Sequence, residues 1–125
     1  MPTEIVVETE DRAGVIADLG ELFGDIGVNI AAAAAFTREG RGFLHFVVDD
    51  ADHALAALHR DGWKVLEARE VLAVSLDDRP GELGRFARRL AKAGVNIRAL
   101  YTAGQRAGDK ELIVAVDDLG SARHV

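Results

Sequence analysis

The chain has 125 residues, a formal net charge of −6 at pH 7 and no cysteine. The absence of cysteine excludes disulfides, thiol nucleophiles and thiolate metal sites, and no apolar run reaches the roughly 18 residues that a membrane-spanning helix needs. Because the net charge repels a phosphate backbone, we expect no binding to nucleic acid, and we expect no membrane association. Glu4, Glu8 and Glu10 stand where a secretory signal would be apolar, so we expect a cytoplasmic protein.

Apolar periodicity in the first half of the chain predicts alternating strands and helices. In chain order these are a strand at 5–7, a helix at 15–26, a strand at 28–36, a hairpin turn at 38–42, a strand at 43–48, a helix at 51–61 and a strand at 63–68. Gly27 and Gly62 are suited to end the two helices, and Asp50 to begin the second. The alanines at 31–35 favour a helix by propensity, but Gly27 has just ended one, so we predict a strand there.

The second half predicts the same order of elements but stops sooner. We expect a strand at 71–76, a helix at 81–92, strands at 95–101 and 112–116, and a helix that opens at Asp118. Val125 lies within about two helical turns of Asp118, so no residues remain for a fourth strand. No turn residue separates the strand at 63–68 from the strand at 71–76, so we do not expect the two halves to tumble independently.

One sequence pattern occurs in both halves, and the two copies align without a gap. The first copy consists of Asp11-Arg12-Ala13-Gly14-Val15-Ile16 and, further along, Gly27-Val28-Asn29-Ile30. The second copy consists of Asp78-Arg79-Pro80-Gly81-Glu82-Leu83 and, further along, Gly94-Val95-Asn96-Ile97. We therefore predict two α+β domains, residues 1–69 and residues 70–125, the second without its final strand. The order β-α-β-β-α-β is the ferredoxin-like arrangement, in which one antiparallel sheet carries both helices on one face.

Both copies resemble the ACT domain. The resemblance rests on the Asp-Arg-Pro-Gly-x-Leu turn at 78–83, the helix that ends at Gly94 and the Val-Asn-Ile segment after it; the first copy has Ala13 for the proline and Ile16 for the leucine. It implies a freestanding tandem protein that is not an enzyme and that binds a small amino acid in a regulatory role. It also implies that the turn of one domain faces the Gly-x-Asn segment of its neighbour, with the ligand between them.

The chemistry of these segments suits an amino acid as ligand. A helix N-terminus offers unpaired N–H groups and a positive dipole end to a carboxylate, glycine allows close approach, and an asparagine amide both donates and accepts. We expect no cofactor and no metal. The aliphatic side chains in these segments favour an aliphatic ligand. The expected ligand-binding residues are Arg12, Ala13, Gly14, Val15, Ile16, Asn29, Ile30, Arg79, Pro80, Gly81, Glu82, Leu83, Asn96 and Ile97.

Each of these residue types also has a purely structural interpretation. Gly14 and Gly81 could serve only to shape a tight turn, and Asp11 and Asp78 suit helix caps or dipole partners better than ligand contacts. The two arginines of the turns could be solvated, and the two asparagines could bond to backbone where their strands begin. Recurrence of the residues in both copies favours the functional interpretation.

Two other classes of function compete with an amino-acid sensor. An enzyme is disfavoured because His53 and His59 fall on nearly opposite faces of a helix, and because a phosphate loop like that of acylphosphatases is absent. A ligand-free assembly module is the stronger alternative, since small ferredoxin-like units pair through sheet edges. The strand at 71–76 would itself lie at an edge that native chains cover, either with the strand at 63–68 across a pseudo-twofold axis or with a second chain. Both covers favour a homodimer, and the sequence does not identify the downstream protein partner.

Overall fold

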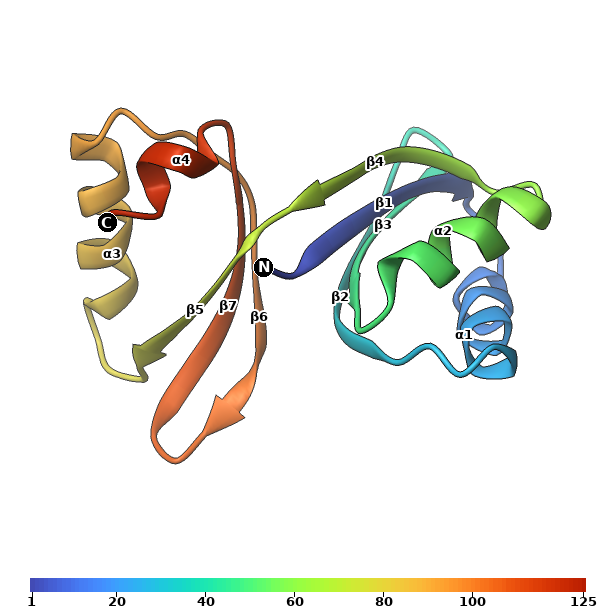
Figure 1. Ribbon diagram of the computed structural model, residues 1–125, viewed down its shortest axis with the longest axis horizontal. Coiled ribbons are helices and arrows are strands. Elements are labelled where there is room, and N and C mark those ends of the chain that lie inside the picture. Colours follow the sequence, from blue (N-terminus) through green and yellow to red (C-terminus); the bar gives the residue numbers. More distant parts are fainter. The chain divides into compact units, whose positions relative to one another are not determined.

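Antiparallel sheets with helices packed on one face make up both halves of the chain in the computed structural model, which describes residues 1–125 (Figure 1). The chain divides into two units, Pro2–Arg69 and Glu70–Val125, and Met1 groups with the second. The predicted α+β class with ferredoxin-like units is confirmed. None of the four helices has the length and apolar character needed to cross a membrane.

The first unit holds a four-stranded sheet in the order β2-β3-β1-β4. Its elements are β1 (Thr3–Glu10), α1 (Val15–Asp25), β2 (Ile30–Arg38), β3 (Arg41–Val48), α2 (Ala51–Arg60) and β4 (Lys64–Glu70). β1 and β3 are antiparallel, with Ile5 opposite Phe46 and Val7 opposite Leu44. These alternate side chains form one core with Phe23 of α1 and with buried residues of α2. The alanines at 31–35 lie in β2, so the predicted strand is confirmed.

The second unit holds a three-stranded sheet in the order β5-β7-β6, so β5 is an edge strand of that sheet. Its elements are β5 (Leu72–Asp77), α3 (Glu82–Lys92), β6 (Ile97–Arg106), β7 (Asp109–Val116) and α4 (Leu119–Ala122). Leu76, Phe86, Leu90 and Leu112 belong to its core. The order of elements follows the first unit up to the short α4, and no fourth strand pairs with this sheet.

Glycine ends the three longer helices with the same backbone geometry. After α1, Gly27 has φ 73°, and its N–H and that of Val28 donate to carbonyls of the last helical turn at 3.2 and 2.9 Å. Gly62 and Gly94 take the same place after α2 and α3. This left-handed turn satisfies carbonyls that a helix end leaves unpaired. Because the Val28 N–H is used in this way, β2 begins at Ile30 instead of the predicted residue 28.

Two-residue turns join the hairpin strands in both units. Glu39 and Gly40 have φ values of 52° and 77°, and Ala107 and Gly108 have 51° and 88°. Positive φ at both central residues is typical of the type I′ turn, whose twist matches that of the flanking strands. The first turn confirms the hairpin predicted at 38–42. In the second unit the strands are longer than predicted, because β6 continues to residue 106 and β7 begins at residue 109, with polar residues paired across the hairpin.

The two copies keep a constant offset until β6 takes up one extra residue. Asp50 is the N-cap of α2, and the offset that relates Asp11 to Asp78 would place its counterpart at Asp117. The N-cap of α4 is instead Asp118, one residue later. The pairing of β6 with β7 shifts between Thr102 and Gly104, whereas β2 has no such shift at the same place. A bulge therefore absorbs the insertion, and Gly104 has φ 143°, where glycine is favoured.

Glu4 of β1 is the one charged residue that is buried. Arg69 Nε donates to Glu4 Oε1 at 2.9 Å, and His45 Nδ1 lies 3.2 Å from Glu4 Oε2. A buried charge is tolerated when it is paired and hydrogen-bonded. These contacts join β1, β3 and β4 on the sheet of the first unit.

Candidate functional site

A left-handed glycine joins the first strand to the first helix in each copy. Gly14 has φ 90° and ψ −6°, and Gly81 has φ 87° and ψ −13°. An L-amino acid with a side chain loses about 1–2 kcal/mol in this conformation, so both positions favour glycine for backbone reasons alone. The geometry therefore supports the turn-shaping interpretation, and contact with a ligand stays a prediction.

The glycine at the N-cap leaves the start of α1 without a side-chain cap. No side chain accepts a hydrogen bond from the first helical turn, and the Asp18 N–H donates to the Gly14 carbonyl at 2.9 Å. α2 and α4 differ, since Asp50 and Asp118 accept from backbone N–H groups, and these bonds hold the pKa of both carboxyls below its ordinary value. The start of α1 therefore offers free donors and the positive end of the helix dipole to an anionic group.

The charged residues before the turns do not act as helix caps. The N-caps are the glycines, so the interpretation of the two aspartates as caps is wrong. Asp78 instead accepts from Gln105 Nε2 at 2.6 Å. Arg12 lies along the first turn, with Nη2 2.6 Å from Asp18 Oδ2 and Nη1 donating to the Ala13 carbonyl at 3.3 Å. Its guanidinium is therefore held beside the open helix start.

A cavity of about 220 Å³ lies beside the first turn. Three predicted residues, Arg12, Val15 and Ile16, line it, and the β2–β3 hairpin supplies Phe36 and Phe43. The two phenylalanine rings stack with their centroids 5.5 Å apart. Ile16 and Phe36 are 54% and 52% exposed. The cavity therefore combines a guanidinium and the end of a helix with an apolar wall.

Sequence reasoning does not single out Phe36 and Phe43, because it places them only as residues of two neighbouring strands. A signal for them is the length of the turn between these strands. A two-residue turn at 39–40 fixes the register of the hairpin, and in that register Phe36 lies opposite Phe43.

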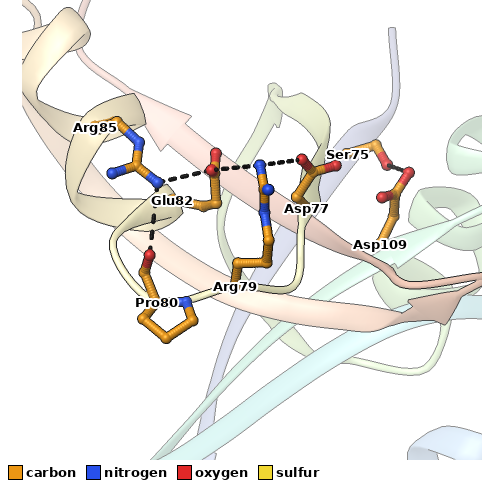
Figure 2. Close-up of polar contacts among 7 residues, drawn as sticks. All are labelled: Ser75, Asp77, Arg79, Pro80, Glu82, Arg85 and Asp109. Carbon is orange, nitrogen blue, oxygen red and sulfur yellow. Dashed lines mark hydrogen bonds and ion pairs between the residues drawn. The ribbon is translucent and has the colours of Figure 1, made fainter.

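Ion pairs fill the equivalent turn of the second copy (Figure 2). Arg79 Nη2 lies 2.7 Å from Asp77 Oδ2 and 3.1 Å from Glu82 Oε1, and Arg85 Nη2 lies 2.7 Å from the same Glu82 oxygen. The hydrogen bond from Arg85, and then the charges of Arg85 and Arg79, hold the pKa of Glu82 below its ordinary value. At neutral pH the first turn of α3 therefore carries a carboxylate that two arginines already match.

Asn29 and Asn96 bond through their backbone and leave their side chains at the surface. The N–H of Asn29 donates to Asp49 Oδ1 at 3.0 Å, and that of Asn96 donates to Asp117 Oδ1 at 2.9 Å. Both asparagines are exposed, and their side-chain amides have no hydrogen-bond partner. α1 has 11 residues, so about 16 Å separates its start from its end, which the Asn29 segment follows. Within one unit, the turn and the asparagine therefore do not form a single site.

The remaining predicted residues divide between core and surface. Ile30 and Ile97 are partly buried and pack against the cores of their units. Leu83 is 37% exposed on α3, and Ala13 and Pro80 are exposed in the turns. Contact of these residues with a ligand stays a prediction.

A larger hollow of about 660 Å³ in the first unit also reaches Arg12 but is lined mostly by charged side chains. Some of these charges have partners, since Glu8 Oε2 lies 3.0 Å from Arg41 Nε and 3.6 Å from Lys64 Nζ. No cluster of three or more histidine, aspartate or glutamate side chains is placed to hold a metal ion. The smaller cavity is the better candidate, because it contains the predicted turn and an apolar wall.

Residues 3–59, which run from β1 into α2, match the family model of the ACT domain. Among solved structures, a protein from Bacteroides thetaiotaomicron is similar with a TM-score of 0.88 and 20% identity, over 98% of this chain and 83% of that chain. The regulatory subunit of aspartate kinase from Thermus thermophilus is similar with a TM-score of 0.71 and 20% identity, over 90% of this chain and 82% of that chain. No curated protein matches the chain. At these identities, the solved structures establish a shared fold.

Replacement of Gly14 by alanine should destabilise the protein by about 1–2 kcal/mol, because alanine at φ 90° is strained. The matched control is Gly20→Ala in the same helix, where the added Cβ meets no atom within 4 Å and should stabilise the protein by about 0.5–1 kcal/mol. Urea denaturation followed by circular dichroism measures both changes. A Gly14→Ala variant as stable as the original chain would contradict the left-handed turn.

Loss of the Asp49 carboxylate in Asp49→Ala should cost about 1 kcal/mol of stability, because the N–H of Asn29 loses its acceptor. Asn29→Ala should change the free energy of unfolding by less than about 0.5 kcal/mol, since the amide is exposed and unpaired. Asp117→Ala and Asn96→Ala repeat the comparison in the second copy. Equal losses in the aspartate and asparagine variants, measured by urea denaturation, would show that the amides have a structural role.

Proposed function

The chain belongs to the ACT domain family through its first unit, and on that premise we propose that it is a non-enzymatic regulatory protein that binds a small amino acid. The proposed site is the cavity beside the first turn, between α1 and the β2–β3 hairpin. A partner protein would respond to the liganded state. The protein would act in the cytoplasm, and the proposed function requires no cofactor.

The observation that carries this proposal is the composition of the cavity. The uncapped N–H groups at the start of α1 suit a carboxylate, and Arg12, which pairs with Asp18 through Nη2, adds a positive charge beside them. Glu10 and Asp11 also line the cavity and suit an ammonium group. Its volume of about 220 Å³ is below the ~300–1,000 Å³ typical of pockets for drug-sized ligands, which suits a molecule as small as an amino acid.

Similarity to a solved structure supports a regulatory role. One solved structure of the same fold is the regulatory subunit of an aspartate kinase. The lining of the cavity contains no histidine, and its charged side chains are of the kinds that bind the two ends of an amino acid. We infer that the chain controls another protein instead of converting its ligand.

A thermal-shift screen of all standard amino acids should find at least one that stabilises the protein. At about 100 times its Kd, such a ligand should raise the free energy of unfolding by about 2.7 kcal/mol. We expect a Kd between about 1 μM and 1 mM. The methyl ester and the N-acetyl derivative of the same amino acid should have little effect, because each lacks one charged end. Absence of a shift with every amino acid would refute the proposal and favour a ligand-free assembly module.

We further propose that the protein is a homodimer. β5 lies at an edge of its sheet and is apolar at residues 72–74 and at Leu76. An edge strand presents a row of unpaired backbone groups, and native proteins cover such edges. Pairing with the same edge of a second copy would close the assembly with two-fold symmetry.

Light scattering at micromolar concentration should give about twice the 13.4 kDa mass of one chain. Ala73→Lys, at an exposed position of β5, should shift the mass toward the monomer, because lysine on an edge strand opposes pairing. Gly20→Ala on α1 is the control, and its mass should equal that of the original chain. A single species of 13.4 kDa for the original chain would exclude the dimer.

A further inference from the structure

We propose that the two copies of the repeat have diverged, so that only the first turn binds an amino acid and its cavity takes an apolar side chain. The equivalent cavity of the second copy is polar and rejects the same ligand. This inference rests on the proposed function, since it specifies the class of ligand and the number of sites. Each chain then binds one molecule of an amino acid with an aliphatic or aromatic side chain.

Two cavities occupy the same place in the two copies. Residues that line the first cavity have counterparts that line the second cavity. Before the bulge of β6 the counterparts follow the offset of the repeated turns, and after the bulge they lie one position further along the chain. The matched pairs are Asp11 and Asp78, Ala35 and Thr102, Thr37 and Gln105, and Gly42 and Lys110. The hairpin registers agree with this match, because Thr37 pairs with Gly42 and Gln105 pairs with Lys110. The two cavities can therefore be compared position by position.

The aromatic wall of the first cavity has no counterpart in the second. Phe36 lies opposite Phe43 in the first hairpin, and Gly104 lies opposite Glu111 at the same place in the second. In the first copy, the exposed Ile16 adds to the apolar surface. An apolar ligand side chain would remove this surface from water, which is favourable.

Polar contacts span the second cavity instead. Asp78 Oδ2 accepts from Gln105 Nε2 at 2.6 Å, and Asp78 Oδ1 lies 3.6 Å from Lys110 Nζ. All three side chains line the cavity. An apolar side chain placed there would take water from these groups without replacing its hydrogen bonds, which is unfavourable.

The second turn also leaves little room for a ligand carboxylate. Glu82 places its own carboxylate between Arg79 and Arg85 (Figure 2). Arg85 Nη1 lies 2.9 Å from the position that a Cβ on Gly81 would take, so its guanidinium covers the glycine. At the first turn, the nearest atom to the same position is Nη1 of Arg12, at 3.7 Å. The first turn also holds an ion pair, between Arg12 and Asp18 at 2.6 Å, but Glu82 lies between two arginines. A carboxylate therefore meets more ion pairs and a more covered glycine at the second turn than at the first.

Isothermal titration calorimetry of the full chain with leucine, phenylalanine, serine and aspartate tests this inference. We expect one ligand molecule per chain. Leucine or phenylalanine should bind at least about tenfold more tightly than serine or aspartate, because the apolar wall rewards an apolar side chain.

Matched variants at equivalent positions locate the site. Ile16 on α1 and Leu83 on α3 are both exposed, so Ile16→Lys and Leu83→Lys should leave the fold intact, which circular dichroism checks. Ile16→Lys should weaken binding at least about tenfold, because it puts a charge against the apolar wall. Leu83→Lys should bind as the original chain does. Phe36→Ser, also at an exposed position, tests the same wall from the hairpin and should weaken binding as well.

The possible outcomes separate this inference from the proposed function. Two molecules per chain, or loss of binding in Leu83→Lys but not in Ile16→Lys, would overturn the inference and leave an amino-acid sensor. Tighter binding of serine or aspartate would overturn the assigned ligand class. If no standard amino acid binds in the calorimeter or in the thermal-shift screen, the proposed function fails, and the inference fails with it.

Discussion

The left-handed glycine before α1 determines both the path of the chain and the chemistry available at the turn. Gly14 is the N-cap, and it has no side chain that could accept a hydrogen bond from the N–H groups of the first helical turn. Asp50 and Asp118 do accept such bonds at the starts of α2 and α4. The chain therefore has capped and uncapped helix starts, and the uncapped ones follow the first strand of each copy. The residue that the backbone needs at this turn is also the residue that leaves N–H donors free.

The two copies agree where the backbone is constrained and differ where only side chains are involved. Glycine with positive φ stands at both ends of α1 and of α3, since few other residues adopt that conformation without strain. The residue types in the wall of the cavity are less constrained. Phe36 and Phe43 are paired strand residues, and a hairpin accepts many side chains at such positions. Glu111 therefore stands in the place of Phe43 without a change in the order of the elements. The duplicated scaffold preserves the shape of the turn but not the chemistry beside it.

The sequence predicts the features that depend on neighbouring residues. Gly27 stops α1 by its own conformation, and that stop outweighs the helix propensity of the alanines in β2. The bulge at Gly104 is not predictable in the same way. In the sequence, one extra residue within a polar stretch looks the same as a hairpin loop that is one residue longer. Contact between the turn and Phe36 depends on how α1 packs over the hairpin, which no local pattern contains. The pairing of Glu82 with Arg85 is predictable from their spacing of three residues on a helix. That Arg85 also covers Gly81 is visible only in the folded structure.

The choice between a ligand sensor and a ligand-free assembly module depends on the kind of apolar surface that the chain leaves exposed. Scattered exposed apolar residues are ordinary on protein surfaces and need no explanation. Ile16 and Phe36 are different, because both line one concave cavity together with an arginine and the start of a helix. Edge pairing covers a strand through its backbone, whereas a concave apolar wall beside charged groups fits a small molecule with one apolar part and two charged parts. The edge of β5 belongs to the second unit and the cavity to the first, so the proposals of assembly and of ligand binding rest on different residues.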